Sequence, residues 1–278
     1  MSKKAYIIGG IAAVVVAGAA YASFGHKTTT TDAKTVTVGR MADSKQEDAI
    51  WKVVSKTAKD KYGITLKYKL FTDYSQPNKA LADGDIDLNA FQNYPFLENW
   101  NKANKTDIVS IGDTFVSPMR VFSNKVKNLN DLKDGATITL PNDATNESRA
   151  LKVLQSAGII KLKSGDTLTV KDVTSNPKNL KLKEVDASQT IQALDSVDAA
   201  VANVNYATAA GLDLSKAIYV EPATGADIKP YYNFIAANAK DKNKTLYKDV
   251  VKSYQTQAVK DEIKKQYGVA EVAVFDVK

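Results

Sequence analysis

The stretch KTVTVGRMADSKQEDAIWKVVSKTAKDKYGITLKYKLF, residues 34–71, decides the fold class. Its first seven residues alternate and include β-branched side chains, which is typical of a strand. The SKQE that begins at Ser44 matches a capping box and predicts a helix, which closes at Gly63. The last eight residues, ITLKYKLF, predict the next strand. The stretch therefore predicts a strand, a helix and a second strand in succession.

The same order continues along the chain. A short helix over residues 78–85 and a strand over 86–91 complete a βαβαβ unit, which predicts a parallel sheet with crossover helices. A second α/β unit follows, with predicted strands over 136–141, 180–186 and 199–204. Its predicted helices cover 146–158 and 188–197, and Ser188 is the expected cap of the second one. The chain ends in two predicted helices over 243–268. Two such units predict an α/β protein with two lobes.

Two extended, aromatic-bearing runs beside proline separate these units, and we interpret them as crossovers between the lobes. They are TFVSPMRVFS, residues 114–123, and KPYYNFIAANAK, residues 229–240. The expected organisation is lobe 1 over 34–117 and 236–278, and lobe 2 with the crossovers over 118–235. Ligands in such folds bind outside the carboxyl ends of strands, so the cleft between the lobes is the expected site.

The N-terminus is typical of an export signal. Lys3 and Lys4 precede an apolar run from Ala5 to Ala22, which ends in AYA before Ser23. Residues 1–22 are therefore predicted to be a secretory signal or an uncleaved membrane anchor, and residues 23–33 a polar tether. Either outcome places the rest of the chain outside the cytoplasm. Loss of residues 1–22 removes two lysines and lowers the net charge from +7 to +5.

Composition excludes several function classes. The chain has no cysteine and one histidine, His26, so thiol chemistry, disulfides, cysteine-bound zinc and histidine-based catalysis are not expected. Lysines are scattered among acidic residues, and the only arginines are Arg40, Arg120 and Arg149, which argues against a nucleic-acid partner. We expect no catalytic residues, no metal and no cofactor. No phosphate-binding GxxxxGK[ST] loop is present, so the chain is not an ATPase subunit.

Aromatic and amide side chains gather at predicted strand ends. In DLNAFQNYPFLENW, residues 87–100, Phe91 and Asn93 follow a strand, and Asn203 ends another. Arg149 lies in the first turns of a helix and Asn233 lies in the second crossover. An aromatic wall, several amides and one fixed cation are what a zwitterionic amino acid with an apolar side chain requires.

Four segments carry a resemblance to a known family: FTDYSQPNKALADGDIDLNAFQNYPFL, VKNLNDLKDGATITLPNDATNESRALKVLQSAGIIKLK, NPKNLKLKEVDASQ and DAAVANVNYATAAGLD. From about Lys34 to the C-terminus, the chain resembles the NlpA-type methionine-binding lipoproteins, which are substrate-binding subunits of methionine ABC transporters. The resemblance implies a two-lobed periplasmic-binding-protein fold of type II that closes on its ligand. It implies that Arg149 binds the ligand carboxylate, that two amides contact the amino acid, and that aromatic residues form the side-chain pocket. The amides are Asn203 and Asn233, and the pocket residues are Tyr74, Phe91 and, in the QNYPF segment, Asn93 and Phe96.

The chain also departs from the family pattern. Asn93 replaces a pocket histidine, Phe96 replaces a tyrosine, and Arg40 and Arg120 stand where smaller or neutral residues are usual. The lipid-bearing cysteine of the family is absent.

The expected function is delivery of methionine or a related amino acid to a membrane permease with its ATPase, with membrane attachment through the N-terminal segment. The alternatives are a binding protein for a short peptide or another amino acid, a surface adhesin, and an enzyme that uses carboxylates on the same fold.

Overall fold

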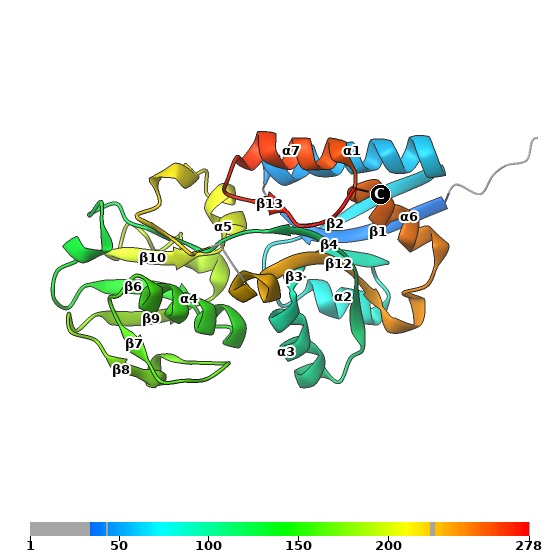
Figure 1. The fold of residues 1–278 in the computed structure, drawn as a ribbon. Helices are drawn as coiled ribbons and strands as arrows, with labels where there is room; N and C mark the ends of the chain where they lie inside the picture. Colours follow the sequence, from blue (N-terminus) through cyan, green and yellow to red (C-terminus); the bar gives the residue numbers. More distant parts are fainter. Residues whose placement is uncertain (1–33, 43, 223–225, 278) are drawn as a thin grey trace, which may run out of the picture. The chain divides into compact units, whose positions relative to one another are not determined.

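The larger of two main sheets combines strands from both ends of the chain. The computed structural model describes residues 34–42, 44–222 and 226–277, and these residues belong to the compact unit Ala33–Lys278. The strand order is β13-β4-β12-β3-β1-β2 (Figure 1). The strands are β1 (Lys34–Met41), β2 (Ile64–Phe71), β3 (Leu88–Asn93), β4 (Ile108–Val116), β12 (Tyr232–Asn238) and β13 (Val272–Ala273). The predicted parallel pairing of β1 with β2 and β3 is confirmed. The whole sheet is mixed, however, because β12 returns antiparallel between β3 and β4.

The first predicted helix, α1 (Lys45–Tyr62), begins and ends where its caps require. The Ser44 hydroxyl accepts a hydrogen bond from the amide of Glu47 at 3.2 Å, which satisfies one of the free donors of the first turn. Gly63 ends the helix in the left-handed region, at φ 68°, which glycine adopts without steric cost. The Glu47 side chain lines a cavity, and the reciprocal bond of a complete capping box is absent from the described residues.

Helices cover both faces of this sheet (Figure 1). One face carries α1, α6 (Thr245–Tyr254) and α7 (Gln257–Tyr267), and the other carries α2 (Pro77–Asp83) and α3 (Tyr94–Asn104). Side chains alternate across a strand, so β12 supplies both cores: Phe234 and Ala236 pack with α2 and α3, whereas Ile235 and Ala237 pack with α1.

The second sheet has the order β11-β5-β10-β6-β9. Its strands are β5 (Arg120–Phe122), β6 (Thr137–Pro141), β9 (Lys181–Val185), β10 (Ala199–Ala202) and β11 (Tyr219–Val220). The remaining elements are α4 (Ala144–Ser156), α5 (Val204–Ala209), the small hairpin β7 (Lys161–Leu162) and β8 (Val173–Ser175), and the 3-10 turns η1 (Leu129–Asp131), η2 (Val170–Asp172), η3 (Ala187–Gln189), η4 (Leu214–Lys216), η5 (Ala226–Tyr231) and η6 (Ala239–Asp241). The three predicted strands β6, β9 and β10 and the helix α4 are confirmed.

One predicted helix, over residues 188–197, is wrong. The 3-10 turn η3 forms at its start, and successive turns follow to Ser196 in place of an α-helix. The cap of η3 is Asp186, which accepts from the Ser188 amide at 2.9 Å. The Thr190 hydroxyl donates to the Ala187 carbonyl at 2.8 Å. Short polar side chains that bond to the nearby backbone favour turns over helices, and this segment carries several of them.

The chain passes between the two sheets at residues 117–119, which join β4 to β5. On the return path, β12 begins at Tyr232 and lies wholly in the larger sheet. Asn233, expected in a crossover, is therefore in a strand, where it is the cross-strand neighbour of Asn93.

Candidate ligand-binding site

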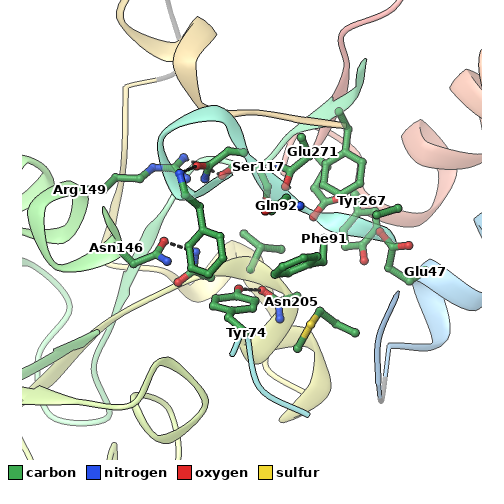
Figure 2. A pocket seen from close by; sticks show the side chains of 18 residues that line it. Glu47, Tyr74, Phe91, Gln92, Ser117, Asn146, Arg149, Asn205, Tyr267 and Glu271 are labelled. Atoms are coloured by element: carbon green, nitrogen blue, oxygen red, sulfur yellow. Dashed lines mark hydrogen bonds between the residues drawn. The ribbon is translucent and has the colours of Figure 1, made fainter. Parts of the chain in front are cut away.

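A cavity lies between residues of the two sheets (Figure 2). It contains about 700 Å³ of space free of protein atoms, part of which is continuous with solvent. The structure brings all the predicted site residues together around it: Tyr74, Phe91, Asn93, Phe96, Arg149, Asn203 and Asn233. Their contact with a ligand stays a prediction.

The apolar wall is a cluster of aromatic rings. Tyr74 lies 5.9 Å from Phe91 and 5.8 Å from Phe96, measured between ring centroids, and Phe91 and Phe96 are 5.7 Å apart. The Tyr74 hydroxyl donates to Asn205 Oδ1 at 2.6 Å. Burial raises the pKa of Tyr74 well above its ordinary value of 10.0, so the phenol is neutral at physiological pH. This wall can bury an apolar side chain while the phenol stays fully bonded.

Arg149 is held rigidly beside the cavity. It lies in α4 with 3% of its surface exposed. Its Nε donates to Glu221 Oε1 at 2.9 Å, and its Nη2 donates to Glu221 Oε2 at 2.6 Å and to the Ser117 carbonyl at 2.9 Å. The guanidinium also lies 4.1 Å from the centre of the Tyr231 ring. Nη1 of Arg149 makes no hydrogen bond to a described residue, so its two N–H groups are available to a ligand.

A chain of side-chain hydrogen bonds fixes the orientation of Asn203. Asp143 accepts from the Asn146 amide at 3.0 Å. The Asn146 Oδ1 in turn accepts from Asn203 Nδ2 at 2.9 Å (Figure 2). Asn203 Oδ1 is buried and lacks a hydrogen-bond partner among the described residues. A buried acceptor without a partner costs free energy, so this oxygen is positioned to receive a donor from a bound molecule.

Asn93 has a structural role that its sequence position did not indicate. Its Oδ1 accepts from the Phe96 amide at 3.1 Å and caps α3. The amide oxygen is thus committed to the helix, and only the Nδ2 group is left for a ligand. Two neighbours on β3, Asn89 and Gln92, are held by hydrogen bonds to the buried side-chain amide of Asn78 in α2. Asn78 Nδ2 donates to Gln92 Oε1 at 2.7 Å, and Asn89 Nδ2 donates to Asn78 Oδ1 at 2.9 Å.

Several cavity residues were not predicted from the sequence. Asn146 lies one helical turn before Arg149, and that spacing is a signal that could have identified it. Glu47, Asn205 and Glu271 also line the cavity. Nothing near Glu221 in the sequence indicates that it pairs with an arginine 72 residues away.

The sequence pattern of the NlpA lipoproteins matches residues 36–275. The chain belongs to the NlpA lipoprotein family. Among its relatives, the probable D-methionine-binding lipoprotein MetQ of Haemophilus influenzae is 41% identical over 225 residues, which are 80% of this chain and 81% of that protein.

Solved structures of similar proteins share the two-lobed α/β fold. A nutrient-binding protein from Burkholderia cenocepacia, solved bound to methionine, superposes with a TM-score of 0.82 at 46% identity, covering 86% of this chain and 100% of that one. The substrate-binding protein of a methionine transporter from Streptococcus pneumoniae superposes with a TM-score of 0.82 at 44% identity, covering 87% of this chain and 96% of that one. Both of these similar proteins are named as binding proteins.

Within the described part of the chain, no group of three or more His, Cys, Asp or Glu side chains is placed to hold a metal ion. No helix in that part combines the length and apolarity needed to cross a membrane. The predicted signal or anchor, residues 1–22, and the tether, 23–33, lie outside the described residues.

Proposed function

We propose that this chain is the extracytoplasmic substrate-binding protein of an ABC importer and that it binds methionine or a closely related amino acid. The observation that carries the proposal is the pairing of opposite polar groups at one cavity: donors on Arg149 and a buried, unpartnered acceptor on Asn203. A free amino acid presents the complementary carboxylate and ammonium groups. The family relatives named as methionine-binding proteins support this ligand.

In the proposed complex, Arg149 Nη1 donates to the ligand carboxylate and Asn203 Oδ1 accepts from the ligand ammonium. Asn93 Nδ2 and Asn233 offer further polar contacts from neighbouring strands. The ligand side chain packs against Phe91 and the other aromatic rings. The two sheets carry different parts of this set, so binding favours closure of the lobes around the ligand. No covalent step is part of this function.

The partners of the protein are a membrane permease and its cytoplasmic ATPase, to which the loaded binding protein delivers its amino acid. We infer export from Lys3, Lys4 and the apolar run that follows. The 278 residues contain no cysteine, so attachment by a cysteine-linked lipid is not expected, and labelling of cells with a lipid precursor should leave this chain unlabelled.

The test is identification of the bound solute. Protein purified without added amino acid is denatured, and released small molecules are identified by mass spectrometry. Calorimetric titrations of stripped protein with L-methionine, D-methionine and glutamine then rank affinities. Methionine in the released fraction, and tighter binding of a methionine enantiomer than of glutamine, are expected. Absence of binding by every amino acid tested would overturn the proposal.

A further inference from the structure

The cavity has a second charged end that the amino-acid clamp does not use. Glu47, at the start of α1, and Glu271, after α7, both line it, together with Tyr267. In Figure 2 these three side chains lie on the side of the aromatic wall away from Arg149 and Asn146. Both carboxyl groups therefore belong to the part of the cavity lining that lies opposite the amino-acid clamp.

Glu271 is a buried carboxylate with one oxygen that has no hydrogen-bond partner among the described residues. Its exposed fraction is 3%, and its Oε2 forms no hydrogen bond with any residue that the structure describes. Burial and repulsion by Glu47 raise the pKa of Glu271 well above its ordinary value, although the nearby Ser117 hydroxyl and Arg120 guanidinium act in the opposite direction. Such a group is costly to keep unless something supplies a donor or a positive charge.

The neighbouring arginines do not fully supply that charge. Arg40 forms its ion pair with Asp48, at 2.9 Å, and lies 4.4 Å from the centre of the Tyr68 ring. Neither Glu47 nor Glu271 forms an ion pair with a described residue. Three carboxyl groups, those of Asp48, Glu47 and Glu271, therefore lie near only two guanidiniums, and burial raises the pKa of both glutamates.

We propose that Glu47 and Glu271 form a subsite for an ammonium group. The inference rests on the proposed function, because it takes Arg149 as the carboxylate end of the same cavity. An ammonium has three N–H donors, which match the two carboxylates and the Tyr267 hydroxyl. The preferred ligand then has an ammonium far from its carboxylate, either on a side chain, as in lysine, or at the N-terminus of a dipeptide.

Two pairs of probes separate these sources, and in each pair only the ammonium differs. Lysine is compared with norleucine, and alanyl-methionine with N-propionyl-methionine. Each is titrated calorimetrically into wild type, Glu271→Gln, Glu47→Gln and Asp60→Asn. The last variant is a matched control, because Asp60 is an exposed carboxylate at the far end of α1. Melting temperatures check that each variant is folded.

The expected result is that at least one charged probe binds wild type at least tenfold more tightly than its uncharged partner. That preference should fall at least tenfold in Glu271→Gln and persist in Asp60→Asn. If Glu271→Gln does not fold, Glu47→Gln decides the same question. A preference for lysine identifies a side-chain ammonium, and a preference for alanyl-methionine identifies a peptide terminus.

Two results would overturn the inference alone. In one, methionine binds wild type but neither charged probe is preferred; in the other, the preference survives in both glutamine variants. If wild type binds neither methionine nor any of the four probes, the proposed function fails, and this inference fails with it.

Discussion

Replacing Arg149 tests the candidate site most directly, because the structure gives this residue two separable roles. It faces the cavity, and it neutralises Glu221, whose side chain is 11% exposed against 3% for Arg149. Arg149→Ala leaves the Glu221 carboxylate unpaired in a buried setting. Removing one partner of such a pair costs about 3–5 kcal/mol. For a unit of this size the melting temperature should fall by roughly 6–20 °C.

The same substitution should weaken ligand binding for a different reason. Loss of one partner of a buried, charge-assisted contact costs about 2–5 kcal/mol of binding free energy, which corresponds to roughly thirtyfold to several thousandfold in Kd. The two effects are distinguished by Arg149→Ala/Glu221→Ala, which removes both charges. That double variant should recover part of the lost stability, since no buried charge is unpaired, but none of the lost affinity.

Stability is measured by urea unfolding and affinity by calorimetry with methionine, on protein stripped of its endogenous ligand. Arg40→Ala is a control for loss of a buried, ion-paired guanidinium that does not line the cavity; it should lower stability and leave the Kd for methionine nearly unchanged. Arg149→Lys keeps the charge but loses the two-pronged geometry, so it should stay folded and still bind at least tenfold more weakly. If the double variant regains affinity together with stability, or Arg149→Ala binds normally, Arg149 is only the structural partner of Glu221.

Three further outcomes follow from other contacts. Asn93→Ala should lower the free energy of unfolding by about 0.5–2 kcal/mol because it removes the cap of α3, whereas Asn93→Asp keeps the acceptor and should retain stability in urea titrations; equal losses would contradict the capping role. Gly112→Ala should cost about 1–3 kcal/mol because its Cβ would overlap Val251, and Val251→Ala in the same chain should recover part of that loss. Burial, and then the charge of Glu47, raise the pKa of Glu271 above its ordinary value of 4.5. The folded protein therefore keeps the Glu271 proton to a higher pH than the unfolded chain does, so the free energy of unfolding falls as the pH rises above 4.5. Glu271→Gln should therefore show a smaller decrease in the free energy of unfolding than wild type as the pH rises above 4.5, and parallel curves would rule this out.

Local features of the sequence determined most of the elements. The alternation in residues 34–40, the Ser44 cap and Gly63 specify a strand and a helix through interactions within a few residues, and each is present in the structure. The wrong helix at 188–197 has the complementary explanation, since a helical period does not reveal that Asp186 and Thr190 will bond to nearby backbone instead.

The sequence also indicated which residues gather at one cavity. Strand ends and a helix start pointed to Phe91, Asn93, Arg149 and Asn203, whereas Tyr74 and Phe96 came from the family resemblance. The sequence could not indicate how their polar atoms are committed. Asn93 gives its oxygen to a helix cap, and Asn203 is turned by Asn146, so the free donor and the free acceptor are known only from the hydrogen bonds.

Tertiary structure alone decided the charges of the site. Glu221 pairs with Arg149, which lies 72 residues earlier in the sequence. Glu271 comes close enough to Glu47, 224 residues earlier, for the two charges to interact. No local pattern encodes such encounters, because they depend on where β4, β11 and the chain after α7 are placed by packing of the two sheets and their helices. Burial then determines what each carboxyl group does: Glu221 anchors Arg149 through an ion pair, whereas Glu271, which forms no ion pair with a described residue, has its pKa raised by burial.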